Sequence, residues 1–397
     1  MKYTQKVLVT GEDFGPAVKK TIIKLDQTID TIDVNNLKVI EEKNAVIDKM
    51  TGEEGIIRTE REVVDAYVSD EYGNKVNIPS SYMTIEMAIS PRIGSPFIFH
   101  ETTQLNNWCN PYRLHISGLD VNPDIDVEND GKLCPQLDKW TMNTYQAIDG
   151  IKYAYAEYRP NNDDDKKHPL VVWLHGLGEG GTDPSIDLLA NKVTALADEP
   201  FQKCMKGAYV LVPQCPTMWM DNGKGEYKSD TKDSIYTKSL FELIDSYVKE
   251  NSDVDVNRIY IGGCSNGGYM TMEMILHYPH YFAAAFPICE AYHDEYITDD
   301  QIDMIKHIPI WFTYAKTDQV IDYTICTIPT VKRLVDAGAS NVHVSVFDNV
   351  HDTTGFYKNE DGSSYTYNGH CSWIYWDNNE CYEGELNAWE WLAQQGN

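Results

Sequence analysis

Basic residues are scarce in this chain of 397 residues. Lys and Arg number 33 against 61 Asp and Glu, so the formal net charge at pH 7 is −28. A field of this sign repels the phosphates of nucleic acid and of anionic membrane surfaces. We therefore expect no nucleic-acid partner, no membrane partner and no highly anionic substrate, which leaves neutral polymers, esters or peptides.

Two further patterns are missing. No C-x-x-C pair occurs among the nine cysteines, which argues against zinc clusters and thioredoxin-like redox sites. Because nine is odd, at least one thiol lacks a partner within the chain, and Cys371 and Cys381 read equally well as a disulfide or as buried thiols. No run approaches 18 uninterrupted apolar residues, which favours a soluble globular protein without a membrane span.

The start of the chain also lacks a signal peptide, because the apolar run after Met1–Lys6 is too short. The chain is then either cytoplasmic or a mature form without its leader. Of the two, the sequence favours a secreted protein whose leader is absent from this chain.

The residues that are present divide the chain in two. About the first 120 residues alternate polar and apolar positions in short runs such as 63–68 and 82–89, which is typical of a β-sandwich. From Ile151 onward strands alternate with helices, which predicts parallel β–α–β units and a doubly wound sheet. Residues 120–135 are rich in Asp, Asn, Pro and Gly, as an interdomain linker is. We therefore expect the boundary between Asp120 and Trp140, and assign an all-β domain to 1–125 and an α/β domain to 126–397.

Several segments of the second domain have a clear periodicity. The apolar run 170–174 predicts a strand that is covered on both faces, and 209–212 is the next strand. Later strands are predicted at 308–314 and 342–347, and an antiparallel strand at 152–158 precedes them all. Helical spacing of apolar residues predicts an amphipathic helix over 234–249, and a further helix over 385–394 closes the chain. The charged run 161–167 reads as a solvated turn, to which we assign no metal.

The most specific motif is Gly263-Cys264-Ser265-Asn266-Gly267. This G-x-S-x-G sequence follows the apolar run Arg258–Ile261 and precedes a helical run, Tyr269–Leu276, as a serine nucleophile elbow requires. Side chains two residues before and after the serine would collide with the neighbouring strand and helix when the backbone bends sharply enough to expose the hydroxyl. The alternative is an ordinary turn made of Gly and Ser.

A nucleophilic serine needs a base and a carboxylate that orients it, in the chain order Ser, Asp or Glu, His. Asp318 follows the strand that ends near residue 314, and Asp322 is the second candidate for the acid. His343 lies inside an alternating strand and reads as structural, whereas His351 and His370 both follow that strand. Spacing alone does not choose between these two.

The reaction also needs N–H groups that stabilise the negatively charged oxygen of the tetrahedral intermediate. We expect one from the backbone of Asn266 and one from Leu177, in the segment His175–Gly178 that follows a predicted strand. Gly178–Gly181 lacks the Gly-Lys-Ser/Thr ending of a phosphate loop, so nucleotide binding is rejected.

In their order along the chain these motifs resemble α/β-hydrolase esterases related to feruloyl and acetyl-xylan esterases and to prolyl-oligopeptidase-like predicted peptidases. The matching segments are 169–183, 212–216, 257–260 leading to Ser265, 308–311 leading to Asp318, and 369–373. The last is similar to the family's Gly-His-x-x-Trp segment, so the resemblance implies that His370 is the base, with His351 as the alternative. It also implies no cofactor and no metal, and an immunoglobulin-like domain for the first part.

Two segments depart from the family pattern. Tyr314–Lys316 stands where a His-Gly pair is common, and Glu290 stands where small residues are common. We assign Glu290, Trp219 and Trp373 to substrate binding, the two tryptophans as walls for an aromatic or sugar-linked acyl group, with a core role as their alternative.

The sequence thus predicts a serine esterase that acts through an acyl-enzyme, on acyl or feruloyl esters linked to plant polysaccharide or on similar small esters. A prolyl-oligopeptidase-like serine peptidase remains open, although the first domain shows no β-propeller repeat. A non-catalytic binding protein with a degenerate hydrolase domain is the third possibility. The sequence leaves the oligomeric state undetermined.

Overall fold

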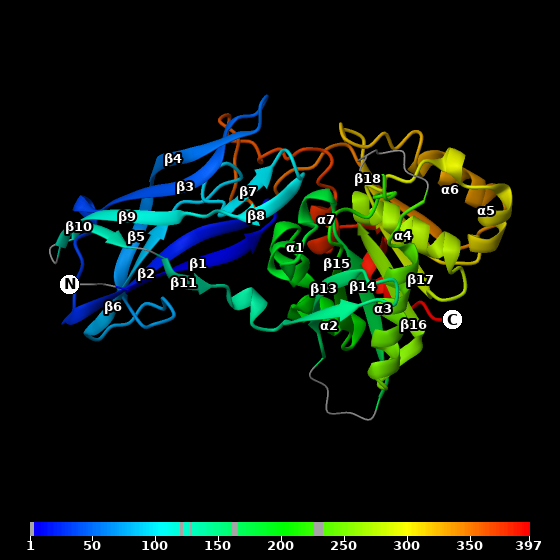
Figure 1. Cartoon of the computed structure of the whole chain (residues 1–397), viewed down its shortest axis with the longest axis horizontal. Coiled ribbons are helices and arrows are strands. Elements are labelled where there is room, and N and C mark those ends of the chain that lie inside the picture. The colour runs from blue at the N-terminus through cyan, green and yellow to red at the C-terminus, as the bar shows by residue number, and fades with distance from the viewer. Residues whose placement is uncertain (1–3, 120–121, 128, 161–165, 225–232) are drawn as a thin grey trace. The chain divides into compact units, whose positions relative to one another are not determined.

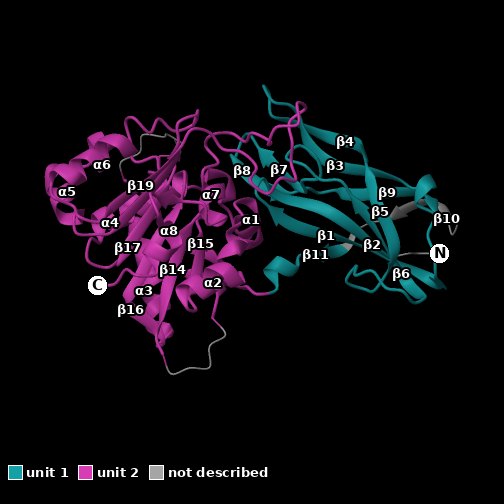
Figure 2. Cartoon of the chain, turned by 180° about the vertical axis from the view of Figure 1, so that it is seen from behind, with its two compact units in different colours: residues 1–138 teal, residues 139–397 magenta. Residues whose placement is uncertain are grey.

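The structure is a computed structural model that describes residues 4–119, 122–127, 129–160, 166–224 and 233–397 (Figure 1). The chain forms two compact units, Met1–Asp138 and Lys139–Asn397 (Figure 2). Most of the charged run 161–167, namely 161–165, lies outside the described residues.

Unit 1 consists of two β-sheets, as the alternating pattern predicted. The five-stranded sheet has the order β11 (Asn129–Leu133), β1 (Thr4–Glu12), β2 (Gly15–Ile29), β6 (Ser80–Met87) and β5 (Val63–Ser69). The four-stranded sheet has the order β10 (Asn122–Val127), β9 (Tyr112–Leu119), β3 (Lys38–Asp48) and β4 (Glu53–Arg61). A separate hairpin joins β7 (Phe97–His100) to β8 (Leu105–Trp108). Alternate residues of β1 such as Val7 and Val9 are buried, which is the inward face of a sandwich.

Unit 1 ends at Asp138, inside the expected boundary region 120–140 but after residue 125. That position lies within β10, and β11 pairs in parallel with β1, so the chain stays in unit 1 up to Asp138. Asp, Asn and Gly are depleted in most strands, which is why this segment resembled a linker. Backbone pairing with β1 and β9 determines its structure instead.

Unit 2 is built on one eight-stranded sheet, in agreement with the predicted doubly wound architecture. Its order is β12 (Thr141–Gln146), β13 (Lys152–Tyr158), β15 (Tyr209–Gln214), β14 (His168–Leu174), β16 (Val254–Cys264), β17 (Ala284–Ile288), β18 (Ile310–Ala315) and β19 (Val342–Phe347). The strands from β15 to β19 in this order are parallel, and β12 and β13 are antiparallel. The helices are α1 (Pro184–Ala190), α2 (Glu199–Met205), α3 (Thr237–Glu250), α4 (Asn266–His277), α5 (Asp299–Ile305), α6 (Thr327–Asp336), α7 (Trp373–Asp377) and α8 (Ala388–Leu392).

The core of unit 2 lies on both faces of this sheet, which explains the near-continuous apolar sequence of its central strands. All seven residues of β14 are buried. Val172 and Leu174 belong to the core that includes residues of α3 and α4. Trp173 points to the opposite face, where its neighbour Phe286 stacks on Trp376 with ring centroids 4.4 Å apart.

The last segment is less helical than the sequence indicated. A short hairpin of β20 (Tyr382–Glu383) and β21 (Leu386–Asn387) occupies the beginning of the predicted helix 385–394, so α8 starts only at Ala388. Gly384 in the turn has φ 61°, a left-handed conformation that suits glycine. None of the helices in the described part of the chain is long and apolar enough to cross a membrane.

Candidate active site

Ser265 lies at a sharp turn between β16 and α4, at the end of the parallel sheet. Its backbone has φ 56° and ψ −114°, a conformation that non-glycine residues rarely adopt. The N–H of Ser265 donates to the carbonyl of Ile288 at 2.9 Å, and its carbonyl accepts from Tyr269 N–H at 2.9 Å. These two bonds tie the turn to the next strand and to the helix. Such strain is kept where the surrounding structure fixes it, as at nucleophile elbows.

The glycines of the motif meet the packing requirement that the sequence predicted. A Cβ on Gly263 would lie 2.1 Å from the carbonyl oxygen of Leu174, and one on Gly267 would lie 1.9 Å from the same oxygen. Both distances are far shorter than any real contact. The elbow therefore packs directly against the end of β14, and the prediction that both positions require glycine is confirmed.

Asp318 and His370 are far apart in the chain but adjacent in the structure. Nδ1 of His370 is 2.8 Å from Oδ2 of Asp318, whose side chain is 2% exposed. The other carboxylate oxygen accepts from the N–H groups of Val320 and Ile321 at 2.8 and 3.0 Å. Burial opposes ionisation of Asp318, but these hydrogen bonds outweigh it, and its pKa lies below the usual value. The carboxylate is thus held ionised beside the imidazole.

Gly369 is the point where the loop of the base meets the loop of the acid. A Cβ at this position would lie 2.3 Å from the carbonyl carbon of Thr317 and 2.6 Å from the N atom of Asp318. Asn368 Oδ1 accepts from the N–H of His370 at 2.9 Å and fixes the following turn. Glycine at 369 therefore lets the two backbones approach closely enough for the imidazole to reach the carboxylate.

The competing candidates have other partners. Nδ1 of His351 is 3.0 Å from both Asn349 Oδ1 and the hydroxyl oxygen of Tyr375, and the ring is exposed. Asp322 is exposed and accepts from the N–H of Thr324 at 2.9 Å.

His343 stacks on Trp311 at 5.0 Å and contacts Glu383, so it is part of the packing around β19. This placement agrees with the structural role that the sequence indicated. Among His343, His351 and His370, only the last contacts Asp318 within the described residues.

The backbone N–H groups of Leu177 and Asn266, which the sequence analysis assigned to the oxyanion, lie at the starts of two helical turns. Asn266 is the first residue of α4, and Leu177 begins a single 3₁₀ turn over Leu177–Glu179. In the part of the chain that the structure describes, neither N–H donates a hydrogen bond, and the Ser265 hydroxyl has no partner either. The side-chain oxygen of Asn266 accepts from Trp219 N–H at 2.6 Å, which orients the residue after the serine.

Two residues that the sequence analysis did not assign hold the turn at 175–179. His175 is fully buried, with Nδ1 2.6 Å from the carbonyl oxygen of Gly176, and Nε2 accepts from Cys215 N–H at 3.0 Å. Burial lowers the pKa of His175 to about 4, so the ring is neutral. Gln214 Nε2 donates to the carbonyl of Glu179 at 2.8 Å. The sequence feature that could have identified Gln214 is its position as a polar residue at the end of an apolar strand.

The three residues assigned to substrate binding are placed differently from one another. Trp219 is 0% exposed and packs against His175 and Tyr153, so it belongs to the core. Glu290 is 1% exposed, and its carboxylate accepts from Tyr292 N–H at 2.7 Å and from Thr327 Oγ1 at 2.9 Å. Neither side chain is exposed to a substrate in this conformation. The Trp219 ring is covered by other rings, and the Glu290 carboxylate is occupied by its two hydrogen bonds.

Trp373 alone remains at the site. It is partly exposed, and its ring stands edge-to-face with His370 at 5.8 Å.

Burial raises the pKa of Glu290 to about 7 despite the two hydrogen bonds that favour its ionised form. Glu290, which stands where related esterases commonly have a small residue, is therefore accommodated inside the unit. It packs closely against α4, since a Cβ on Gly268 would lie only 2.8 Å from Glu290 Cα.

The polar segment between β19 and His370 forms an ordered hairpin, residues 350–367. Tyr367 N–H donates to the carbonyl of Val350 at 2.9 Å, and Lys358 pairs with Ser364 near the tip. The buried Asp352 accepts from Gly355 N–H at 2.8 Å and fixes the bend that leaves Phe356 82% exposed. The base thus follows a well-defined surface hairpin.

The cysteines and the possible metal ligands bear on two of the sequence predictions. All nine cysteines are free thiols, so Cys371 and Cys381 are not bridged. The described residues contain no group of three or more His, Cys, Asp or Glu side chains arranged to hold a metal ion.

Comparison with known families agrees with both units. Residues 160–355 match the family described as Phospholipase/Carboxylesterase, and residues 4–120 match the Esterase Ig-like N-terminal domain. The two matches lie in the α/β unit and in the β-sandwich unit respectively.

Comparison with solved structures and curated proteins gives more distant relatives. A thermostable esterase is 23% identical, with a TM-score of 0.75 over 99% of this chain and 100% of that chain, which shows a shared fold. A ferulic acid esterase is 15% identical, with a TM-score of 0.43 over 60% of this chain and 93% of its own. An uncharacterized secreted protein of Arthroderma benhamiae is 27% identical over 164 residues, 38% of this chain but only 16% of that protein's length.

Proposed function

The chain is an α/β-hydrolase of the phospholipase/carboxylesterase family with an Ig-like esterase domain before it, and on that premise we propose that it hydrolyses carboxylic esters through an acyl-enzyme on Ser265. The observation that supports the proposal most is the contact of 2.8 Å between His370 and Asp318, in a chain that also holds Ser265 in a strained turn. A nucleophile, a base and an oriented carboxylate on separate loops are what acyl transfer requires.

In the proposed reaction the Ser265 hydroxyl attacks the ester carbonyl while Nε2 of His370 takes its proton. Nδ1–H donates to Asp318, which holds the tautomer and stabilises the imidazolium. The backbone N–H groups of Leu177 and Asn266 stabilise the oxyanion. His370 then protonates the leaving alcohol, and a water molecule activated by the same imidazole releases the acid.

The hydrogen bond between Ser265 and His370 is expected to form when substrate binds. Catalytic hydrogen bonds are often long in unliganded sites and tighten in the substrate complex. The half-buried hydroxyl of Ser265, fixed by its backbone and not by a side-chain partner, is free to rotate toward either the imidazole or the substrate.

We propose acyl or feruloyl esters linked to plant polysaccharide, or similar small esters, as substrates. The net charge of −28 favours neutral esters over anionic ones. Trp373, partly exposed beside His370, offers an aromatic wall to an acyl or alcohol ring. We further propose that residues 1–125, assigned by sequence to the all-β domain, carry no catalytic group, and that catalysis lies within 126–397.

A fluorophosphonate probe followed by peptide mass spectrometry tests the nucleophile. We expect one adduct, on the peptide that contains Ser265, and no adduct in Ser265→Ala. An adduct on another peptide would refute the assignment, and absence of labelling would favour a binding protein. A panel of p-nitrophenyl esters, methyl ferulate, acetylated xylan and aminoacyl anilides tests the substrate class. Faster turnover of anilides than of esters would indicate a peptidase.

A further inference from the structure

We propose that Glu290 is a positioning residue of the active site, which fixes the loop of Asp318 relative to the turn of Ser265. We call residues 316–326, between β18 and α6, the acid loop. The inference rests on the proposed function, because it takes Ser265 as the nucleophile and Asp318 as the acid. Related esterases commonly have a small residue at position 290, so the family resemblance does not imply this role.

The segment Ile288–Glu290 is in direct contact with the nucleophile turn. The carbonyl of Ile288 accepts from the N–H of Ser265 at 2.9 Å. A Cβ on Gly268, in the first turn of α4, would lie 2.8 Å from both the Ile288 carbonyl oxygen and Glu290 Cα. Because the two backbones pack this closely, the segment cannot shift without moving the start of α4. The position of Glu290 is thus coupled to that of Ser265.

The same segment is attached to both ends of the acid loop. The N–H of Cys289 donates to the carbonyl of Thr313, in β18, at 2.7 Å, just before the chain enters the loop. Thr327, the first residue of α6, donates from Oγ1 to Oε1 of Glu290 at 2.9 Å, where the chain leaves the loop. Asp318 lies between these two attachments. Three consecutive residues therefore connect the nucleophile turn to both ends of the loop that carries the acid.

Backbone strain occurs within this segment as well as at the nucleophile. Cys289 has φ 37° and Ser265 has φ 56°, values that non-glycine residues rarely adopt. Such conformations persist only where surrounding contacts fix them, and they cluster at functional sites. At Cys289 the contacts are its hydrogen bond to Thr313 and the packing of Glu290 on α4.

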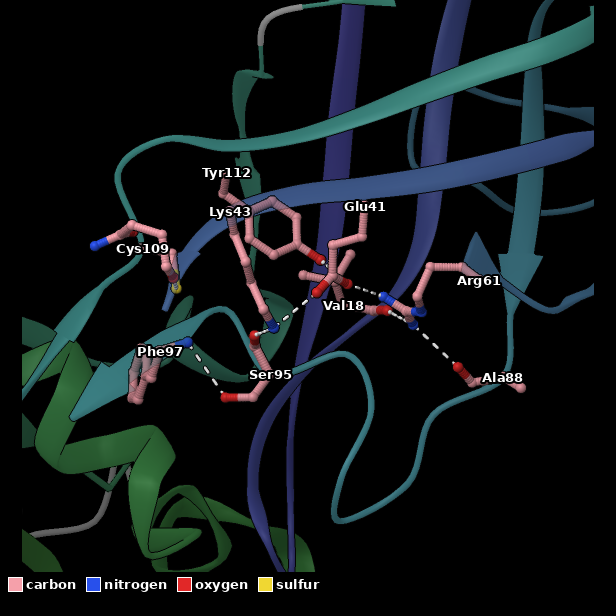
Figure 3. A network of polar contacts seen from close by, with 10 residues as sticks. Val18, Glu41, Lys43, Arg61, Ala88, Ser95, Phe97, Cys109 and Tyr112 are labelled. Atoms are coloured by element: carbon pink, nitrogen blue, oxygen red, sulfur yellow. Dashed lines mark hydrogen bonds and ion pairs between the residues drawn. The ribbon is translucent and has the colours of Figure 1, made fainter. Parts of the chain in front are cut away.

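Neutral donors hold the Glu290 carboxyl. Its side chain lies in a residue that is 1% exposed, and the N–H of Tyr292 and the hydroxyl of Thr327 donate to its two oxygens. The buried Glu41 of unit 1 instead contacts the guanidinium of Arg61 (Figure 3). Two directional hydrogen bonds keep a buried side chain in one orientation. The arrangement at Glu290 is thus suited to fix a distance between two elements.

Both hydrogen bonds are compatible with either protonation state of Glu290. Burial raises its pKa to about 7, so both forms are present near neutral pH. In the protonated form the Tyr292 N–H, which can only donate, keeps one oxygen as its acceptor, and the other oxygen donates its proton to the Thr327 hydroxyl. Glutamine offers the same pattern of one acceptor and one donor. The positioning role therefore needs the two bonds and not the charge.

A second buried Thr–Glu pair in unit 2 provides a matched control. Thr237, the first residue of α3, donates from Oγ1 to Oε1 of Glu273 at 2.8 Å, and Glu273 is also 1% exposed. This bond joins α3 to α4 and does not involve the acid loop. Substitution of either threonine by valine removes one donor from a buried carboxyl. Thr327→Val and Thr237→Val should therefore lose similar stability, which urea denaturation measures.

Steady-state kinetics on a p-nitrophenyl ester separate the two pairs. Thr327→Val should lower kcat by about fivefold to tenfold, because the acid loop is released. KM should change by less than about twofold, since the acid serves acylation and deacylation alike and both steps slow together. Thr237→Val should keep kcat within about twofold. Equal losses of kcat in the two variants would overturn the proposal.

Variants of Glu290 test the bonds against the charge. Glu290→Leu removes both bonds and should lower kcat at least as much as Thr327→Val does, whereas Glu290→Gln should stay within about twofold of the unmodified enzyme. The double variant of Glu290→Leu with Thr327→Val should be no slower than Glu290→Leu alone, because one bond joins the two side chains. Glu290→Gln that is as slow as Glu290→Leu would overturn the proposal. Thr327→Val keeps the test valid if Glu290→Leu does not fold.

The hydrogen bond between His370 and Asp318 gives a readout that does not depend on turnover. The Nδ1 proton of His370 in this bond gives a low-field NMR signal, which His370→Ala identifies. We expect Thr327→Val to shift or broaden that signal and Thr237→Val to leave it unchanged. An unchanged signal and kcat in Thr327→Val, in a chain whose Ser265 is labelled by the fluorophosphonate, would refute the positioning role alone. Absence of labelling would refute the proposed function, and the NMR signal would still show whether Glu290 positions Asp318.

Discussion

Each unit buries a carboxylate beside a nitrogen base, but the two pairs differ in what surrounds them. In unit 1, Glu41 and Arg61 are enclosed on all sides, with Arg61 also donating to the carbonyls of Val18 and Ala88 at 3.0 Å. In unit 2, Asp318 is equally buried, but its partner His370 is 12% exposed and lies on a loop at the end of a parallel sheet.

The difference shows that the solvent access of a buried ion pair decides whether it can take part in proton transfer or only hold its neighbours in place. An enclosed guanidinium keeps its proton at any ordinary pH and can only position its neighbours. An imidazole is the side chain best suited to general acid and base catalysis, and the exposed part of His370 can contact a substrate. The Asp318–His370 pair is therefore suited to proton transfer, and the Glu41–Arg61 pair to structural support.

Replacement of Ser265 should give the largest effect, and it tests whether unit 2 carries the chemistry. Ser265→Ala should lower kcat by roughly 10⁴–10⁶ because the nucleophile is lost, while the melting temperature stays unchanged. Steady-state kinetics on a p-nitrophenyl ester and a thermal melt of the same sample measure both quantities. Retained turnover above 1% of the unmodified enzyme would place the reaction elsewhere.

The choice of base gives the next largest effect. His370→Ala should reduce kcat about as much as the serine variant does, because nucleophile and base act as a unit. His351→Ala should keep most of its turnover, since His351 contacts Tyr375 and Asn349 instead of Asp318. The opposite order of the two variants would transfer the role of base to His351.

In unit 1 the expected effect is on stability alone. Glu41→Gln leaves Arg61 buried without its countercharge and should reduce the free energy of unfolding by about 3–5 kcal/mol. The matched control is Glu86→Gln, whose partly exposed ion pair with Lys20 spans 3.8 Å and should contribute about 1 kcal/mol or less. Urea denaturation measures both. A loss of kcat in folded Glu41→Gln would mean that the Glu41–Arg61 pair also contributes to catalysis.

Two buried groups of unit 2 should affect stability in opposite directions as the pH changes. The pKa of His175 is about 4 in the folded chain against 6.5 ordinarily, so between these values only the unfolded chain binds the proton and stability rises with pH. The pKa of Glu290 is about 7 against 4.5, so between these values only the folded chain binds the proton and stability falls with pH. Each contribution amounts to about 3 kcal/mol over its window.

In the unmodified protein these two slopes nearly cancel between pH 4.5 and 6.5. His175→Gln should therefore make the free energy of unfolding fall more steeply with rising pH, and Glu290→Gln should make it rise. Urea titrations at four pH values across the window give the slopes. Parallel curves for the three proteins would show that neither group changes its protonation on folding.

Local sequence was enough for the elements whose pattern matches their environment. The central strand at 170–174, the edge strand at 342–347 and the serine motif with its two glycines were predicted, because apolar or alternating runs and close backbone contacts are visible in the sequence. Edge strand β12, which is polar and exposed, and β17, which contains Pro287, have no such pattern and were not anticipated.

The site was predictable in its chain order but not in its contacts. The pairing of His370 with Asp318 joins residues 52 positions apart, and spacing left His351 as an equal candidate. The resemblance to known esterases, not the local pattern, favoured His370. The burial of Trp219 and Glu290 could not be predicted either, because the residue type alone does not show whether an aromatic or acidic side chain near a motif faces the substrate or the core.

The surface hairpin at 350–367 places the covalent connection between nucleophile and base at an exposed, protease-accessible bend. Cleavage beside Phe356 or Lys358 would divide the chain after Asp318 and before His370. The C-terminal piece would remain docked, since Trp376, Trp389 and Trp391 are all buried. This hydrolase unit could accordingly work as a split enzyme, in which a separately made C-terminal fragment restores turnover by bringing the imidazole with it.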